Sequence, residues 1–346
     1  MREYNYESRN IDELLQFLYE DGLKKSKHLS DIEIKNILTN IGMFKFKGYC
    51  YAFKGALSGY SIDDIFMLYF FDKYLTRIVM DLTSSIETKL KTTLVELCYE
   101  RLRNLPAGNN NKNNPFFYLI NRNYKRAGFK INNVTLGNWK PLESTNGQEC
   151  YSHYGLYYQN KYDFSTNKSR YIVNQPTIEL YDDINYPPFH YIIEGATLDG
   201  VNRFIESLMI GNYDVLKGVS RKFGVSNGES FRHYLKRLNE LRNRAAHRER
   251  IFNRSYRSIR RTGKFNWISS SLNNHKFMDV YLYLFFMLGR IDEYENLEDF
   301  ELKEFKVLFL GFRNDYFINK DSYGLIEKMN VEDFMKIKDF IVQGMK

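Results

Sequence analysis

Residues 238–251 read Leu238-Asn239-Glu240-Leu241-Arg242-Asn243-Arg244-Ala245-Ala246-His247-Arg248-Glu249-Arg250-Ile251. Apolar residues recur here at spacings of three and four, which predicts a helix that buries one stripe (Leu235, Leu238, Leu241 and Ala245). Polar residues at a spacing of four follow another face (Asn239, Asn243 and His247). The pattern therefore predicts the end of a bundled helix that presents a histidine, an asparagine and several arginines.

Helical periodicity extends over most of the chain. It predicts helices at 11–20 and 31–41, and one long helix or two nearly continuous ones from the cap at Ser61 to about residue 103, with Glu87 and Lys91 as a surface ion pair. It predicts one helical stretch over 192–209, another over 213–223, and the motif helix from residue 229 or 230. An apolar helix at 277–291 is expected at the centre of the core, and two or three acidic helices over 291–346.

Two segments lack this period. Residues 42–53 alternate aromatic and basic side chains, which suits a strand or an extended connector. Residues 106–188 begin with an Asn-rich loop and remain rich in tyrosine, so we interpret them as an irregular insertion whose tyrosines either stack on bases or fill gaps in a loop-rich layer. We expect a mainly all-α protein with an N-terminal helical segment (1–57), a helical core (58–105 and 189–290), the insertion (106–188) and acidic C-terminal helices (291–346).

The composition limits the classes to which this protein can belong. The 346 residues are 43% hydrophobic with only six prolines, which favours long helices. No N-terminal targeting pattern and no bilayer-length apolar run are seen, and the three cysteines (Cys50, Cys98 and Cys150) have no metal-like spacing. The five other histidines have no ligand-like neighbours, and His190 and His233 are interpreted as structural. We expect a cytoplasmic protein with no membrane contact, metal or cofactor.

The positive charge is concentrated around the motif. The chain has a net charge of +8, but residues 201–265 hold 16 Lys/Arg against 5 Asp/Glu, a net +11, which leaves a net −3 for the remainder. Such a basic region suits a polyanion, chiefly nucleic acid, although a solvated helix face would have the same composition. A DNA-binding regulator is the weaker interpretation, because no helix-turn-helix or zinc-finger spacing is present.

The pair Arg242 and His247 poses a geometric question. Five residues along a helix rotate a side chain by about 140°, so the two side chains do not share a face. We therefore expect either that the helix ends here or that a second subunit supplies a paired copy of the motif.

The flanks of this pair resemble a known family. The stretch from Leu241 to Arg254 (Leu-Arg-Asn, Ala-His, a basic residue, Ile, then aromatic-Asn-Arg) is similar to the signature of the abortive-infection AbiD/AbiF-like phage-defence proteins, whose core belongs to the HEPN superfamily. Upstream blocks also resemble it: Leu68-Tyr69-Phe70-Phe71-Asp72, Ser85-Ile86-Glu87-Thr88-Lys89-Leu90, Tyr186-Pro187-Pro188-Phe189 and Gly195-Ala196-Thr197-Leu198-Asp199-Gly200. The resemblance covers roughly residues 32–254. The sequence departs from the family pattern at Arg77, because Leu75-Thr76-Arg77 stands where the family often has Leu-Arg. It also departs at Phe189 and His190, where tryptophan is common in the family.

The resemblance implies a HEPN-type bundle and, as in many superfamily members, metal-independent cleavage of RNA with 2′,3′-cyclic phosphate ends. His247 would then act as general acid or base, and Arg242 would hold the phosphate. Asn243 would orient either the histidine or a phosphate oxygen. The flanking arginines would bind the RNA backbone (Arg244, Arg248, Arg250, Arg254 and Arg257). The alternative is a non-catalytic protein that holds a structured small non-coding RNA regulating defence. A homodimer is compatible with both.

Overall fold

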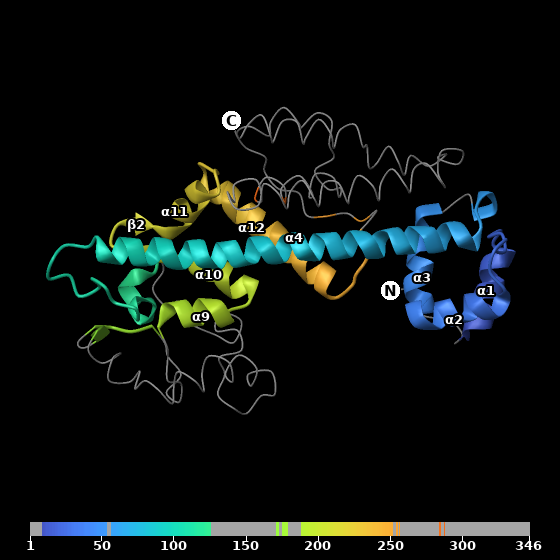
Figure 1. Ribbon diagram of the computed structural model, residues 1–346, viewed down its shortest axis with the longest axis horizontal. Coiled ribbons are helices and arrows are strands. Elements are labelled where there is room, and N and C mark those ends of the chain that lie inside the picture. The colour runs from blue at the N-terminus through green and yellow to red at the C-terminus, as the bar shows by residue number, and fades with distance from the viewer. Residues whose placement is uncertain are drawn as a thin grey trace, which may run out of the picture.

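The structure of the chain, a computed structural model, is described for residues 9–53, 57–125, 171–172, 175–178, 188–251, 254, 256, 284 and 287. Its axis is α4, which runs unbroken from Ile62 to Arg103 along the length of the described part (Figure 1). At its start, the Ser61 backbone N–H and hydroxyl donate to the Asp64 carboxylate at 2.7 and 2.9 Å. The long helix predicted from periodicity is confirmed, and it is one helix.

Three short helices pack at the N-terminal end of α4: α1 (Ile11–Glu20), α2 (Asp31–Ile41) and α3 (Met43–Cys50). The first two confirm the predicted helices, and Ser30 and Glu33 form a capping box at the start of α2. The prediction of a strand or extended connector at 42–53 was wrong. Gly42, with φ of 84°, turns the chain directly into α3, which a short 3₁₀ turn (Tyr51–Phe53) follows. The buried residues of α3 recur at helical spacing (Met43, Phe46, Tyr49 and Cys50).

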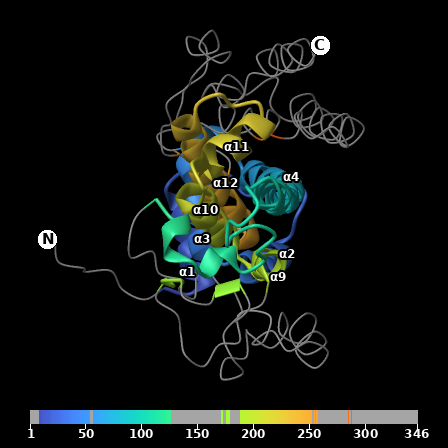
Figure 2. The same ribbon diagram turned by 90° about the vertical axis from the view of Figure 1, so that its left-hand side faces the viewer.

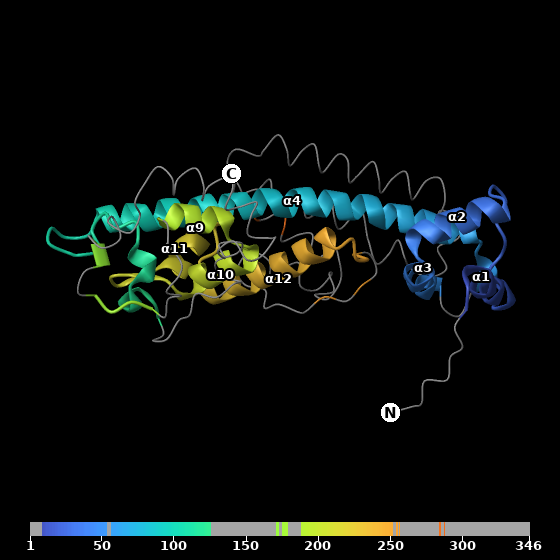
Figure 3. The same cartoon turned by 90° about the horizontal axis from the view of Figure 1, so that it is seen from below.

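The C-terminal half of α4 carries the helices around the motif. These are α9 (Phe189–Gly195), α10 (Leu198–Ser207), α11 (Val215–Lys222) and α12 (Gly228–Ala246). Figure 2 shows α10, α11 and α12 together on one side of α4, and Figure 3 shows the same grouping from below. Among them, α12 packs directly on α4.

The single helical stretch predicted over 192–209 was wrong in two places. Ala196 and Thr197 are extended, and the Thr197 hydroxyl caps α10 by accepting the Gly200 N–H at 3.2 Å. After α10, a two-stranded antiparallel hairpin follows, in which β1 (Met209–Ile210) pairs Met209 with Asp214 of β2 (Tyr213–Asp214). The helix predicted at 213–223 is shorter than expected, because Tyr213 and Asp214 belong to β2 and α11 begins at Val215.

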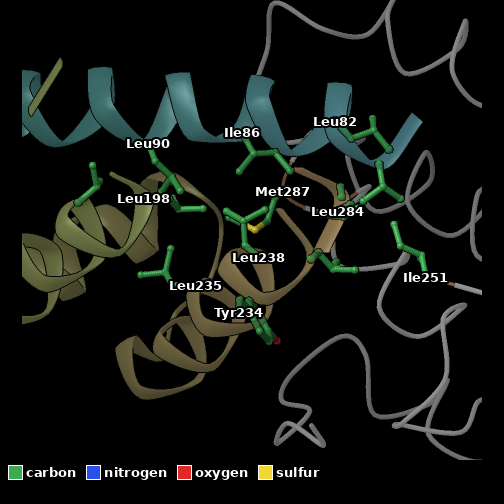
Figure 4. Close-up of a cluster of buried hydrophobic side chains, with 14 of the residues drawn as sticks. Leu82, Ile86, Leu90, Leu198, Tyr234, Leu235, Leu238, Ile251, Leu284 and Met287 are labelled. Carbon is green, nitrogen blue, oxygen red and sulfur yellow. The ribbon is translucent and has the colours of Figure 1, made fainter. Parts of the chain in front are cut away.

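The core lies between α4 and the helices packed on it. Leucines and isoleucines of α4 face the apolar stripe of α12, as Figure 4 shows for Leu82, Ile86, Leu235 and Leu238. Leu284 and Met287 are helical and buried in the same cluster. The rest of the predicted 277–291 helix and the acidic 291–346 segment lie outside the described residues.

The start of the predicted insertion is part of this core. Phe116, Phe117 and Tyr118 are buried, and the Asn-rich loop before them is an ordered polar network rather than a loose linker. The Asn111 side chain donates to Asn123 at 2.9 Å, and Asn123 donates to the Phe117 carbonyl at 2.7 Å. The described tyrosines at 118 and 124 are buried, whereas residues 126–170 lie outside the description.

Two further expectations concern thiols and membranes. Cys50 and Cys98 are free and buried, and Cys150 lies outside the described residues. No helix in the described ranges is long and apolar enough to cross a bilayer.

Candidate functional site at the end of α12

The motif sits where α12 ends, and its end has a specific geometry. His247 is the C-cap, and Arg248 takes the left-handed conformation with φ of 51°. The Arg248 N–H donates to the Ala245 carbonyl at 3.0 Å, and the Glu249 N–H donates to the Arg244 carbonyl at 2.9 Å. These two bonds define a Schellman motif, which is usually built on glycine. The helix end expected from the spacing of Arg242 and His247 is therefore confirmed.

Arg242 points to α4. Its Nε lies 3.4 Å from the Glu87 Oε2, and the Glu87 Oε1 lies 3.3 Å from the Lys91 Nζ. The Arg242 side chain is 34% exposed, while those of Glu87 and Lys91 are 14% and 17% exposed. The pair Glu87–Lys91, predicted as a surface pair, is thus largely buried and forms a triad with the motif arginine. The Arg242 Nε is itself buried and donates no hydrogen bond within the described residues.

His247 and Asn243 face solvent. Both residues are exposed, and the Asn243 carbonyl accepts the His247 backbone N–H at 3.0 Å. No hydrogen bond joins the side chains of Arg242 and His247 in the part of the chain that the structure describes. The site thus has an arginine anchored against α4 and a histidine accessible at the helix terminus.

Arg244 is the centre of a charge network. It contacts Glu240 at 2.9 Å and Glu249 at 3.0 Å, and its side chain is only 20% exposed. Glu249 also contacts Arg254 at 3.2 Å. The Arg244 guanidinium lies 5.7 Å from the centre of the Tyr256 ring. Two of the arginines predicted to bind RNA are therefore paired with carboxylates, and a bound phosphate would compete with those acids.

Arg248 and Arg250 lie against α3. The Lys45 Nζ donates to the Arg248 carbonyl at 2.6 Å, and the Arg250 guanidinium donates to the Gly48 carbonyl. Arg250 also lies over the Tyr49 ring, 5.8 Å from its centre. The Arg248 side chain is exposed and contacts no carboxylate within the described ranges. Arg257, the remaining predicted RNA contact, lies outside the described residues.

Asp72 connects the motif to the N-terminal half of the fold. Its buried carboxylate accepts the Tyr49 hydroxyl at 2.6 Å and the Ile251 backbone N–H at 3.1 and 3.3 Å. The Tyr256 hydroxyl donates to the Ile251 carbonyl at 2.7 Å. Burial, followed by the Asp72 charge, raises the pKa of the Tyr49 and Tyr256 phenols well above the ordinary 10.0. The two phenols therefore remain neutral donors.

Asp72 and Glu87 are the residues near the motif to which sequence reasoning assigned no role in the site. Both stood in the blocks that carry the family resemblance, but only as markers of helices. For Asp72 the available indication was its place between Leu68 and Leu75 in the apolar pattern of the helix, because an acid in such a position is buried only with partners.

The acids within the basic region are neutralised by neighbours. Glu206 and Glu229 contact Arg232 at 3.2 and 3.0 Å, and Asp214 contacts Lys125 at 2.7 Å. Several exposed cations touch no carboxylate in the described part of the chain (Lys217, Arg221, Lys222 and Lys236). The excess of positive charge therefore remains available to an external anion.

The remaining histidines and acids form no competing centre among the described residues. The His190 Nδ1 lies 2.8 Å from the Tyr99 hydroxyl, and burial lowers the pKa of His190, which supports its structural interpretation. Within the described ranges, no group of three or more His, Cys, Asp or Glu side chains is arranged to hold a metal ion.

Comparison with known proteins adds one match. The model of a family described as Abi-like protein matches residues 36–253, from α2 to just beyond the motif. No curated protein and no solved structure matches the chain.

Proposed function

Because the chain belongs to the Abi-like family, a family of abortive-infection defence, we propose that it acts on RNA as an endoribonuclease at the end of α12. The observation that carries this proposal is that an anchored arginine and an accessible histidine lie at the same end of α12. Arg242 is held by Glu87, and His247 stands exposed at the helix terminus five residues later. We further propose that the bundle is of HEPN type, as the motif's resemblance implies.

The residues suit transesterification of the RNA backbone. The 2′-oxygen attacks the adjacent phosphorus as its proton leaves, the bond from phosphorus to the 5′-oxygen breaks, and that oxygen takes up a proton. The products are a 2′,3′-cyclic phosphate and a 5′-hydroxyl. His247 serves as one of the proton-transfer groups, because imidazole exchanges a proton near neutral pH. Arg242 stabilises the charge that develops on the phosphate, and Asn243 orients the phosphate or the histidine.

A second subunit would complete this chemistry. One exposed histidine supplies one proton-transfer group, whereas a symmetric pair of α12 ends at one cleft would supply two. The proposed homodimer therefore places the two His247 side chains on opposite sides of one phosphate.

The test compares matched substitutions in purified protein. His247→Ala and Arg242→Ala should abolish cleavage, with the fold intact by circular dichroism. The exposed residues His28 and Arg103 provide controls of the same side-chain types, and His28→Ala and Arg103→Ala should retain activity. Mass spectrometry of the fragments should find 2′,3′-cyclic phosphate. A wild-type protein that cuts no host or phage RNA during infection, with defence against phage unchanged in both motif variants, would refute the proposal.

A binding role is the second candidate, and one observation favours it. The Arg242 and His247 side chains do not meet within one described chain, and Arg242 is engaged by an acid. In this role the motif holds a structured small non-coding RNA. His247→Ala should then weaken RNA binding and the defence phenotype in parallel, and sequencing of RNA that co-purifies with the protein should find one uncut species.

A further inference from the structure

The exposed side of α3 combines aromatic rings with positive charge. Phe44 is 95% exposed and Tyr51 is 64% exposed, although the neighbouring Phe46 and Tyr49 are almost fully buried. Phe44, Lys47 and Tyr51 follow one another at spacings of three and four, so they share one face of the helix and its 3₁₀ continuation. Gly48 lies on the same face, and a Cβ placed on it would meet open space. These residues form an open shelf with an exposed ring near each end.

Helix α3, which carries this shelf, is bonded to the candidate site by two contacts. The Lys45 Nζ, one residue from Phe44, donates to the Arg248 carbonyl at 2.6 Å. The Arg250 guanidinium donates to the carbonyl of Gly48, in the middle of the shelf. A bound polymer that lies on His247 and Arg248 would therefore also lie close to α3.

The charge of the shelf suits a polyanion. Residues 34–62 contain four lysines and no Asp or Glu, and one of the four, Lys35 of α2, is paired with Asp12 at 2.9 Å. Lys47 is exposed and lies over the Phe17 ring, 5.5 Å from its centre, and Lys45 lies 5.9 Å from the centre of the Tyr69 ring. Glu249, the acid within the motif, is already bound by Arg244 and Arg254. Exposed aromatic rings among cations are the combination that binds single-stranded nucleic acid, since bases stack on the rings while cations follow the phosphates.

We propose that the shelf formed by Phe44, Lys47 and Tyr51 binds unpaired bases of the RNA whose backbone occupies the end of α12. The inference rests on the proposed function and makes the substrate class specific: RNA that is single-stranded beside the cleaved phosphate. A paired base would keep its stacking partners within the duplex and offer no free face to Phe44.

The test measures binding of a short single-stranded oligoribonucleotide that carries 2′-O-methyl groups, which block cleavage, and one 2-aminopurine. Phe44→Ala should raise the Kd about 5- to 100-fold and remove the fluorescence change of the 2-aminopurine, because each stacked base contributes that much affinity. Tyr51→Ala should act in the same direction. Ile32→Ala, which shortens an apolar side chain that is 73% exposed on α2, is the control and should leave the Kd unchanged. The same sequence in a duplex should bind more weakly and be insensitive to Phe44→Ala.

Phe44→Leu separates base stacking from an apolar contact with a protein. Leucine keeps the apolar surface but has no ring, so it should lower RNA affinity nearly as much as alanine does. If Phe44→Leu and Phe44→Ala bind the oligonucleotide as the wild type does, the inference is overturned. Sedimentation that then shows a dimer broken by Phe44→Ala would assign the shelf to a second copy of the chain. Cleavage that still depends on His247 would, in that event, leave the proposed function standing.

Discussion

The Nε of Arg242 lies 3.4 Å from the Oε2 of Glu87, so the scaffold helix α4 holds the arginine of the motif. Glu87 is also 3.3 Å from Lys91, whose Nζ donates to the Glu194 carbonyl of α9 at 3.1 Å. The position of the Arg242 guanidinium thus depends on three helices. A short interaction network of this kind can set the orientation of a phosphate-binding group without touching the phosphate.

Replacing Glu87 by glutamine should therefore slow the proposed cleavage. The amide keeps the shape of the side chain but loses the charge that orients Arg242, and kcat should fall about 10-fold with little change in KM. Steady-state cleavage of a labelled RNA gives both values. Glu96→Gln, on an exposed position of the same helix, should leave them unchanged. Equal kcat values for wild type and Glu87→Gln would exclude a positioning role.

Replacing Asp72 by asparagine should destabilise the fold. The Asp72 carboxylate accepts bonds from Tyr49 and Ile251 while it is buried, and an amide in its place has only one oxygen to accept them. We expect a loss of roughly 3 kcal/mol in the free energy of unfolding, measured by chemical denaturation. Asp81→Asn, on an exposed position of α4, should change it by less than about 0.5 kcal/mol. Equal losses in the two variants would show that the Asp72 bonds contribute little.

Stability should fall above pH 10 in a way that depends on Tyr49. The pKa of Tyr49 is raised in the folded protein, mainly by burial and next by Asp72, whereas an unfolded tyrosine ionises near 10.0. Below that pH both states keep the proton and stability is complete. Above it the unfolded state loses the proton first, so stability falls by about 1.4 kcal/mol per pH unit for each such tyrosine. Denaturation between about pH 8 and about pH 11 should show a shallower fall in Tyr49→Phe.

Tyr74 supplies the control for this slope, because its side chain is 56% exposed. Tyr74→Phe should keep the alkaline slope of the wild type. A Tyr49→Phe curve that merely runs parallel to the wild-type curve, displaced by a constant amount, would contradict the linkage argument.

Replacing Arg248 by glycine should stabilise the end of α12. Arg248 has φ of 51°, which costs a residue with a Cβ about 1 kcal/mol. Its carbonyl, which accepts the Lys45 bond, is retained in any substitution. Arg248→Gly should therefore raise the free energy of unfolding by about 1 kcal/mol, whereas Arg248→Ala, which keeps the strain, should not. Both variants should reduce the salt dependence of RNA binding by about one charge, which separates backbone strain from phosphate contact.

Replacing Gly218 by alanine should destabilise the packing of α11 on α4. A Cβ at this position would overlap the Tyr213 hydroxyl and lie 2.7 Å from the Leu97 Cδ2. We expect a loss of about 1 to 3 kcal/mol, measured as a lower midpoint of thermal unfolding and converted at that temperature. Gly48→Ala is the matched helical control. Its Cβ would meet nothing within 4 Å, so it should be neutral or slightly stabilising.

The periodicity of apolar residues predicted most of the fold, because it shows which face of each helix is buried. The apolar stripe of α12 is buried throughout, and α1, α2 and α4 lie where their caps and spacings predict. The prediction failed at Ala196 and Thr197, where the backbone is extended and separates α9 from α10 although the helical spacing of apolar residues continues across the break. It also failed where alternation of residue types concealed a short helix, because Phe44 of α3 is an apolar residue on an exposed face.

The long scaffold helix, the buried stripe of the motif helix and the concentration of positive charge could be predicted from the sequence, since each depends on local spacing or on composition. The long-range partners of the charged residues became evident only once the helices were packed together. Arg242 meets Glu87, and Arg250 reaches Gly48 across some two hundred residues of chain. Pairing at such a separation depends on how whole helices pack, and no local period encodes it. The same packing brings α3 into contact with the end of the motif helix through Lys45 and Gly48.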